Sequence, residues 1–60
     1  MLFDILVMFA DGKELTYEAL PDWGLAGGSL VLHHGDNSTT IIAEGEWREA
    51  TVSPVKTNEN

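Results

Sequence analysis

Residues 27–52 read GGSLVLHHGDNSTTIIAEGEWREATV, and this stretch alternates short apolar runs with turn residues. Runs of leucine and β-branched residues, of the length of strands, lie within 29–34 and 39–43. Between them, Gly-Asp-Asn-Ser at 35–38 is typical of a tight turn, because Asp and Asn bond to their own backbone and tolerate left-handed conformations. The stretch therefore predicts a β-hairpin.

A third strand is predicted after this hairpin. Gly45 permits a sharp corner, and residues 47–52 resume a strand-like pattern. Pro54 ends this strand because proline cannot donate to a hydrogen-bonded ladder. We therefore expect residues 1–53 to form a single β-domain and the polar residues 54–60 to form a flexible C-terminal tail.

The first half of the chain predicts two further strands joined by a tight turn. Residues 3–9 are apolar at odd and even positions apart from Asp4, so this strand either lies at the centre of a barrel or faces a subunit partner. Asp11-Gly12 is a strong hairpin signal, with Gly12 at a position that favours positive φ. Residues 14–19 then alternate polar and apolar side chains, which predicts one face toward water. The core face of this strand is expected to hold Leu15, Tyr17 and Ala19.

Residues 20–28 form the longest predicted connection, with Pro21 near its start and glycines at its end. Trp23 and Leu25 in its middle are too apolar for a solvated loop, so we expect them to fold back over one end of the core. No window carries the apolar spacing of an amphipathic helix. The chain is therefore predicted to be all-β, a five-stranded antiparallel meander rolled into a small SH3-like barrel or half-barrel.

Composition narrows the class of protein further. The chain has 60 residues, of which 10 are acidic and 3 are Lys or Arg, and its formal net charge is −7. This charge argues against binding nucleic acid through phosphates or an anionic membrane surface, and it is compatible with a basic protein partner. Without cysteine, neither disulfides nor thiolate-bound zinc can complete a small core. Because no targeting signal is recognised, a cytoplasmic location is expected.

No constellation of side chains predicts catalysis. His33 and His34 with Asp36 form the one cluster of metal-ligating residue types, but adjacent strand residues point to opposite faces, so we expect no metal site. The glutamates after the hairpin could serve as acid and base only in a pocket that shifts one pKa, and a small filled barrel has little room for one. We therefore expect no enzyme activity and no cofactor.

A contact surface is the remaining kind of site that the sequence indicates. Tryptophan is enriched in cores and at interface hot spots, and we assign Trp47 to the core or its rim and Trp23 with Leu25 to a surface. The second apolar face of the first strand and the acidic residues after the hairpin are further candidates. These further candidates are Leu2, Leu6, Met8, Glu44, Glu46 and Glu49.

One ordered set of residues is shared with a known group of proteins. The set comprises Gly27-Gly28-Ser29-Leu30-Val31-Leu32, a turn, Ile41-Ile42-Ala43, Gly45-Glu46-Trp47 and Val52. Together with the Asp11-Gly12 hairpin, it resembles small all-β proteins of phages, prophages and actinobacteria, many of which have no known function. His33-His34 and the insertion at 21–25 depart from the commoner short-loop version. The resemblance implies a small, phage-encoded accessory protein that works by binding rather than by turnover.

Two functions are consistent with these observations. The first is a non-enzymatic protein–protein interaction module, an accessory protein that inhibits a host protein or imitates nucleic acid through its acidic surface. The second is a structural or assembly protein that acts as a homo-oligomer, with the even-numbered face of the first strand packed against its own copy. Direct binding to nucleic acid or to a membrane is not expected.

Overall fold

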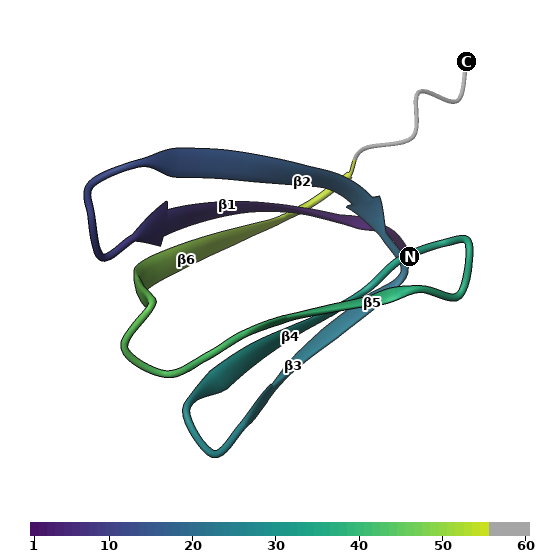
Figure 1. Cartoon of the computed structure of the whole chain (residues 1–60). Helices are drawn as coiled ribbons and strands as arrows, with labels where there is room; N and C mark the ends of the chain where they lie inside the picture. The colour runs from purple at the N-terminus through teal and green to yellow at the C-terminus, as the bar shows by residue number, and fades with distance from the viewer. Residues whose placement is uncertain (56–60) are drawn as a thin grey trace.

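A computed structural model describes residues 1–55, which form six strands and no helix (Figure 1). The strands are β1 (Phe3–Phe9), β2 (Glu14–Leu20), β3 (Asp22–Ala26), β4 (Ser29–His33), β5 (Thr39–Ile42) and β6 (Trp47–Pro54). They form two three-stranded antiparallel sheets, in the orders β2-β1-β6 and β3-β4-β5. The all-β prediction is confirmed. The predicted number of five strands is wrong, and the two sheets do not close into a barrel.

The additional strand is β3, which lies in the segment predicted to be a long connection. It pairs with β4 along its whole length, with Trp23 opposite Leu32. Pro21 and Gly24 concealed this strand, because both residue types are rare inside strands. Trp23 therefore belongs to a sheet, not to a loop folded over the core.

Two turns follow the predicted chemistry. In the β1–β2 turn, Gly12 has a φ of 92° and the Phe9 N–H donates to the carbonyl of Lys13 at 2.7 Å. In the β4–β5 turn, the His34 N–H donates to the carbonyl of Ser38 at 2.9 Å. The left-handed residue in this turn is Asn37, with a φ of 72°, and not Gly35. Both connections are built on a reverse turn that ends in a left-handed residue, a common hairpin geometry.

A β-bulge in β2 changes the predicted core face of this strand. The β1–β2 register shifts between Phe3 and Ile5, which places one extra residue on the β2 side. Ala19 adopts a φ of 56° there, and its N–H donates to Oδ1 of Asp4 at 2.9 Å. The predicted core position of Ala19 is therefore wrong, since Ala19 is exposed and Leu20 is buried.

The core lies between the two sheets. It consists of Ile5, Val7, Leu20, Leu30, Leu32 and Ile42. Trp23 and Trp47 are partly buried and pack against this core, so Trp47 lies at the rim as predicted. The Trp47 Nε1–H donates to the carbonyl of Gly28 at 3.1 Å, which ties β6 to the β3–β4 turn and joins the two sheets at that end.

Strand β6 runs to Pro54, one residue beyond the predicted domain boundary. The next residue is also held, because the Val55 N–H donates to the carbonyl of Leu2 at 2.9 Å. The rest of the predicted flexible tail, residues 56–60, lies outside the described residues. Within residues 1–55, no helix is long and apolar enough to cross a membrane.

Candidate functional site

The outer face of the β2-β1-β6 sheet, on the side away from the core, combines apolar and acidic side chains. Strand β1 lies in the centre of this sheet. Side chains alternate along a strand, and the odd-numbered ones of β1 face the core, so its even-numbered ones point outward. Antiparallel pairing places Glu14 and Glu49 on either side of Met8. We define the outer face as Asp4, Leu6, Met8, Glu14, Thr16, Glu49, Thr51 and Ser53.

The apolar centre of the outer face is accessible to solvent. Leu6 exposes 37% of its surface although it lies in the middle strand of its sheet, and Leu2, just before β1, exposes 43%. Met8 is partly exposed in the next row. Nothing in residues 1–55 covers these side chains, so a second molecule can reach them.

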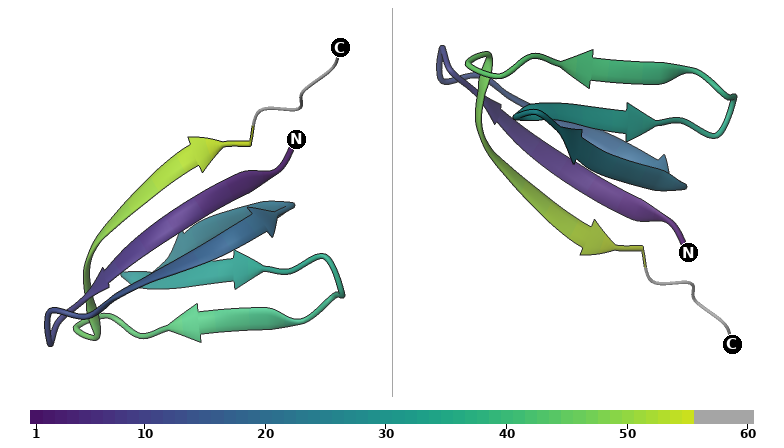
Figure 2. Two further views of the ribbon diagram at one scale, coloured as in Figure 1. Left: turned by 90° about the horizontal axis from the view of Figure 1, so that it is seen from above. Right: turned by 90° about the horizontal axis from the view of Figure 1, so that it is seen from below.

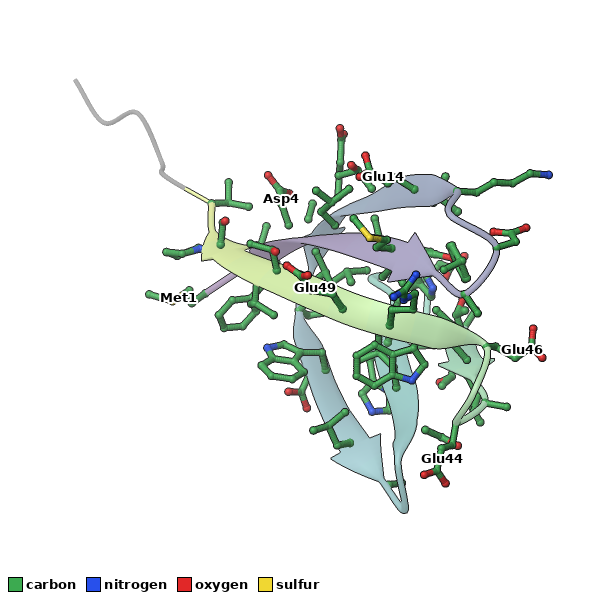
Figure 3. The ribbon with its side chains drawn as sticks, turned by 90° about the vertical axis from the view of Figure 1, so that its left-hand side faces the viewer. Met1, Asp4, Glu14, Glu44, Glu46 and Glu49 are labelled. Atoms are coloured by element: carbon green, nitrogen blue, oxygen red, sulfur yellow. The ribbon has the colours of Figure 1, made fainter. Side chains whose placement is uncertain are left out.

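Carboxylates surround this apolar centre. Figure 3 shows Asp4 and Glu14 above the β2-β1-β6 sheet, on the side away from β3 and β4. Glu49 lies directly opposite Met8 on β6. Three carboxylates outnumber the one adjoining cation, Arg48, which lies at the register shift of β6 beside Glu49, so the field of the outer face is negative. Its apolar centre therefore suits a partner with cationic groups around an apolar patch.

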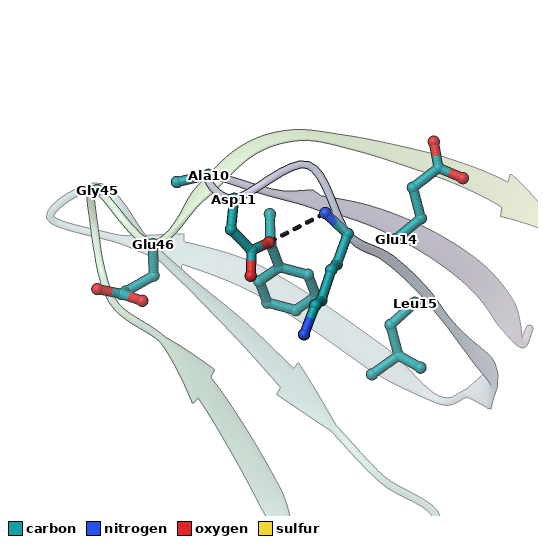
Figure 4. Close-up of a pocket in the computed structure, with 8 residues that line it drawn as sticks. Ala10, Asp11, Glu14, Leu15, Gly45 and Glu46 are labelled. Carbon is teal, nitrogen blue, oxygen red and sulfur yellow. Dashed lines mark hydrogen bonds between the residues drawn. The ribbon is translucent and has the colours of Figure 1, made fainter.

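A groove lies at the end of the molecule formed by the β1–β2 and β5–β6 turns. It has a volume of about 370 Å³ and is shown in Figure 4. Phe9 and Leu15 supply its apolar wall, and Asp11 and Glu46 bring carboxylates to it. The predicted core position of Leu15 is wrong, because Leu15 exposes 51% of its surface and does not belong to the core. The Asp11 carboxylate already accepts the backbone N–H of Lys13 at 3.0 Å, so it serves the turn.

The sequence-predicted contact residues fall into separate places. Leu2, Leu6, Met8 and Glu49 lie together on or beside the outer face, and Glu46 lies at the end groove. The other three lie elsewhere. Glu44 sits against Gly28 at the β3–β4 turn, and Trp23 and Leu25 belong to β3 in the second sheet.

Asp4 and Glu14 were not predicted as members of this site. Glu14 follows from the Asp11-Gly12 turn once the hairpin geometry is known, because that geometry fixes Met8 opposite Glu14. Asp4 carries a structural role as well, since its carboxylate holds the bulge at Ala19.

His33 is the last residue of β4 and His34 follows it. Their rings contact Thr39 and Thr40, which are adjacent in β5 and therefore face opposite sides of that sheet. His33 is exposed, with Nδ1 3.4 Å from the hydroxyl of Thr39. His34 is partly buried, shares a 2.7 Å hydrogen bond between Nε2 and the Thr40 hydroxyl, and packs edge-on against Tyr17 with ring centroids 6.2 Å apart. Within residues 1–55, no group of three His, Cys, Asp or Glu residues could hold a metal ion.

Comparison with known proteins gave no match among family models, curated proteins or solved structures.

Proposed function

We propose that the protein is a non-enzymatic interaction module that binds a basic protein partner through the outer face of the β2-β1-β6 sheet. The observation that carries this proposal is Leu6, which is exposed in the middle of a central strand. Two residues further along this strand, Met8 lies between Glu14 of β2 and Glu49 of β6. An accessible apolar centre with a charged rim is the usual arrangement of a protein interface.

The partner is proposed to be a host protein that this accessory protein inhibits, in the cytoplasm. The phage origin rests on the resemblance of the 27–52 stretch to phage and prophage proteins. We do not propose imitation of nucleic acid, because a mimic needs its acids on one side. Glu44 lies at the β3–β4 turn and Asp36 in the β4–β5 turn, both away from the outer face.

A structural role as a homo-oligomer is the second candidate function. The observation that favours it is the same uncovered apolar centre, which a second copy could cover. Light scattering coupled to size exclusion, over a range of protein and salt concentrations, separates the two candidates. A dimer that does not dissociate on dilution supports assembly, and a monomer supports binding to a foreign partner.

The proposed site is tested by comparing variants in affinity capture from the host lysate. The Leu6→Ser/Met8→Ser double variant removes the apolar centre at an exposed and a partly exposed position, outside the buried core, so the fold is expected to survive. The double variant should fail to capture proteins that the wild type captures. Leu25→Ser is the matched control, because Leu25 is 63% exposed on the other sheet and should change nothing. Equal capture by the wild type and the double variant would reject the outer face as the site.

A further inference from the structure

The edge strand β5 offers unpaired backbone groups to solvent. Among residues 1–55 it pairs only with β4, and Figure 2 shows it at the margin of the molecule in both views. In an antiparallel pair of strands, opposite residues alternate between pairs that are hydrogen-bonded to each other and pairs that are not. In the β4–β5 hairpin, His34 and Ser38 form a hydrogen-bonded pair, so the pair His33–Thr39 does not. Thr40 and Ile42 therefore bond to β4, whereas the N–H and C=O groups of Thr39 and Ile41 point away from it. Thr39 is exposed and Ile41 exposes 67% of its surface, so this edge is accessible.

The other three sheet edges in residues 1–55 carry features that oppose pairing with another strand. Strand β2 contains the bulge at Ala19, and β6 has a register shift and ends at Pro54. On β3, the Asp22 carboxylate accepts the N–H of Trp23 at 2.9 Å, which occupies an outward donor of that edge. Natural edge strands usually carry such protection.

Strand β5 lacks these protective features. Its four residues are Thr39, Thr40, Ile41 and Ile42, all β-branched and uncharged, with a continuous register to β4 and no bulge. β-Branched residues favour extended structure, and an uncharged edge does not repel an incoming strand. The edge is therefore suited to the addition of a strand.

Charge around β5 selects the kind of strand that can be added. Asp36 precedes β5 and Glu44 follows it, and both side chains are exposed. A second copy paired antiparallel through β5 would bring Asp36 of each copy toward Glu44 of the other, which is unfavourable. An extended segment with cationic residues on both sides of an uncharged centre would meet opposite charges at both ends.

We propose that β5 binds an extended basic segment of a partner protein by strand addition, with Thr39 and Ile41 supplying the backbone hydrogen bonds. This inference goes beyond the proposed function, because it uses a different sheet and a different kind of contact. Variants of the outer face leave β5 unchanged, so either proposal can fail without the other.

The test uses the capped peptide Lys-Lys-Thr-Val-Thr-Val-Lys-Lys, titrated into the full chain by calorimetry. The control peptide has the same sequence, but the backbone nitrogens of its central Thr-Val-Thr-Val are methylated. This change keeps the charge and removes the backbone N–H donors on both edges of the peptide. The control should bind about tenfold or more weakly. Amide exchange should slow at Thr39 and Ile41 on adding the parent peptide, and not at Thr40, which already pairs with β4.

Two variants at one position separate backbone from side-chain effects. Ile41→Pro removes an outward N–H without removing a bond to β4, so it should weaken peptide binding about tenfold, whereas Ile41→Thr keeps the N–H and should bind within about twofold of the wild type. Equal binding of the parent and N-methylated peptides would overturn the proposal, since attraction would then be charge alone. A peptide-free dimer that Ile41→Pro dissociates would also overturn it, because a second copy would then occupy the edge.

Discussion

The two glycines of the β3–β4 turn provide a quantitative test of the packing at the end of the molecule. Gly27 and Gly28 have φ values of 59° and 89°, so both occupy left-handed conformations that disfavour other residues. Their surroundings differ. A Cβ at Gly27 would meet no atom within 4 Å, whereas a Cβ at Gly28 would lie 2.7 Å from Cδ of Glu44.

The expected losses of stability differ accordingly. An alanine in a left-handed conformation costs about 1–2 kcal/mol, and the reduced entropy of the unfolded chain offsets about 0.5–1 kcal/mol of this. Gly27→Ala should therefore lower the free energy of unfolding by about 1 kcal/mol. Gly28→Ala must also displace the Glu44 side chain, at about 0.5–1.5 kcal/mol, for a total of about 2 kcal/mol. Adding Glu44→Ala to Gly28→Ala should return the loss to about 1 kcal/mol.

Urea unfolding followed by tryptophan fluorescence measures these differences, because both tryptophans pack against the core. The whole domain is expected to be stable by only about 3–9 kcal/mol, so a difference of 1 kcal/mol is readily resolved. If Gly27→Ala and Gly28→Ala cost the same, and removal of the Glu44 side chain gives no recovery, the packing of Glu44 over this turn is refuted.

Further predictions concern the β4–β5 hairpin and its contact with the core. In its turn, Gly35→Ala should stabilise the protein by about 0.4–1 kcal/mol, because the φ of Gly35 is not positive and its surroundings are open. Asn37→Ala should destabilise the protein by about 1 kcal/mol, because Asn37 is left-handed with a φ of 72°. Urea unfolding compares the two variants. Ile42→Ala should cost about 2–5 kcal/mol and leave much of the protein unfolded by circular dichroism. Hydrogen bonds from the Ser38 hydroxyl and then the Ser38 backbone lower the pKa of Asp36, so its contribution to stability is present above the ordinary Asp pKa of about 3.9 and is lost as pH falls through the lowered pKa. Ser38→Ala should raise the pKa of Asp36 in an NMR titration. The stabilities of the Ser38→Ala variant and the wild type should converge in acid, where Asp36 is protonated in both.

The sequence carried the local signals of this fold better than the long-range ones. The left-handed Gly12 and the turn at 35–38 depend on neighbouring residues alone, and both were predictable. The bulge at Ala19 depends on a carboxylate 15 residues earlier in the chain, which no local pattern reveals. Strand β3 was missed because its proline and glycine signals outweighed its pairing with β4, which only the folded chain supplies.

The candidate site was predictable in its centre and in one rim residue, Glu49, but not in the rim residues Asp4 and Glu14. The apolar even-numbered positions of β1 identified Leu6 and Met8 directly. The rim depends on register across three strands, and a register shift beside Met8 in the β1–β6 pairing determines that Glu49 lies opposite it. The β5 edge could not be recognised from sequence, since a run of β-branched residues does not show which of its sides remains unpaired.

Charge distinguishes the partners that the outer face can accept. Two copies stacked through Leu6 and Met8 would bring Glu14 and Glu49 of each against those of the other. Each pair of like charges at about 8 Å costs about 0.5 kcal/mol in water, and salt screens this repulsion over a Debye length of about 8 Å at physiological ionic strength. A homodimer through this face should therefore tighten as salt is raised, and a complex with a basic partner should weaken. The sign of the salt dependence thus identifies the partner class before the partner itself is known.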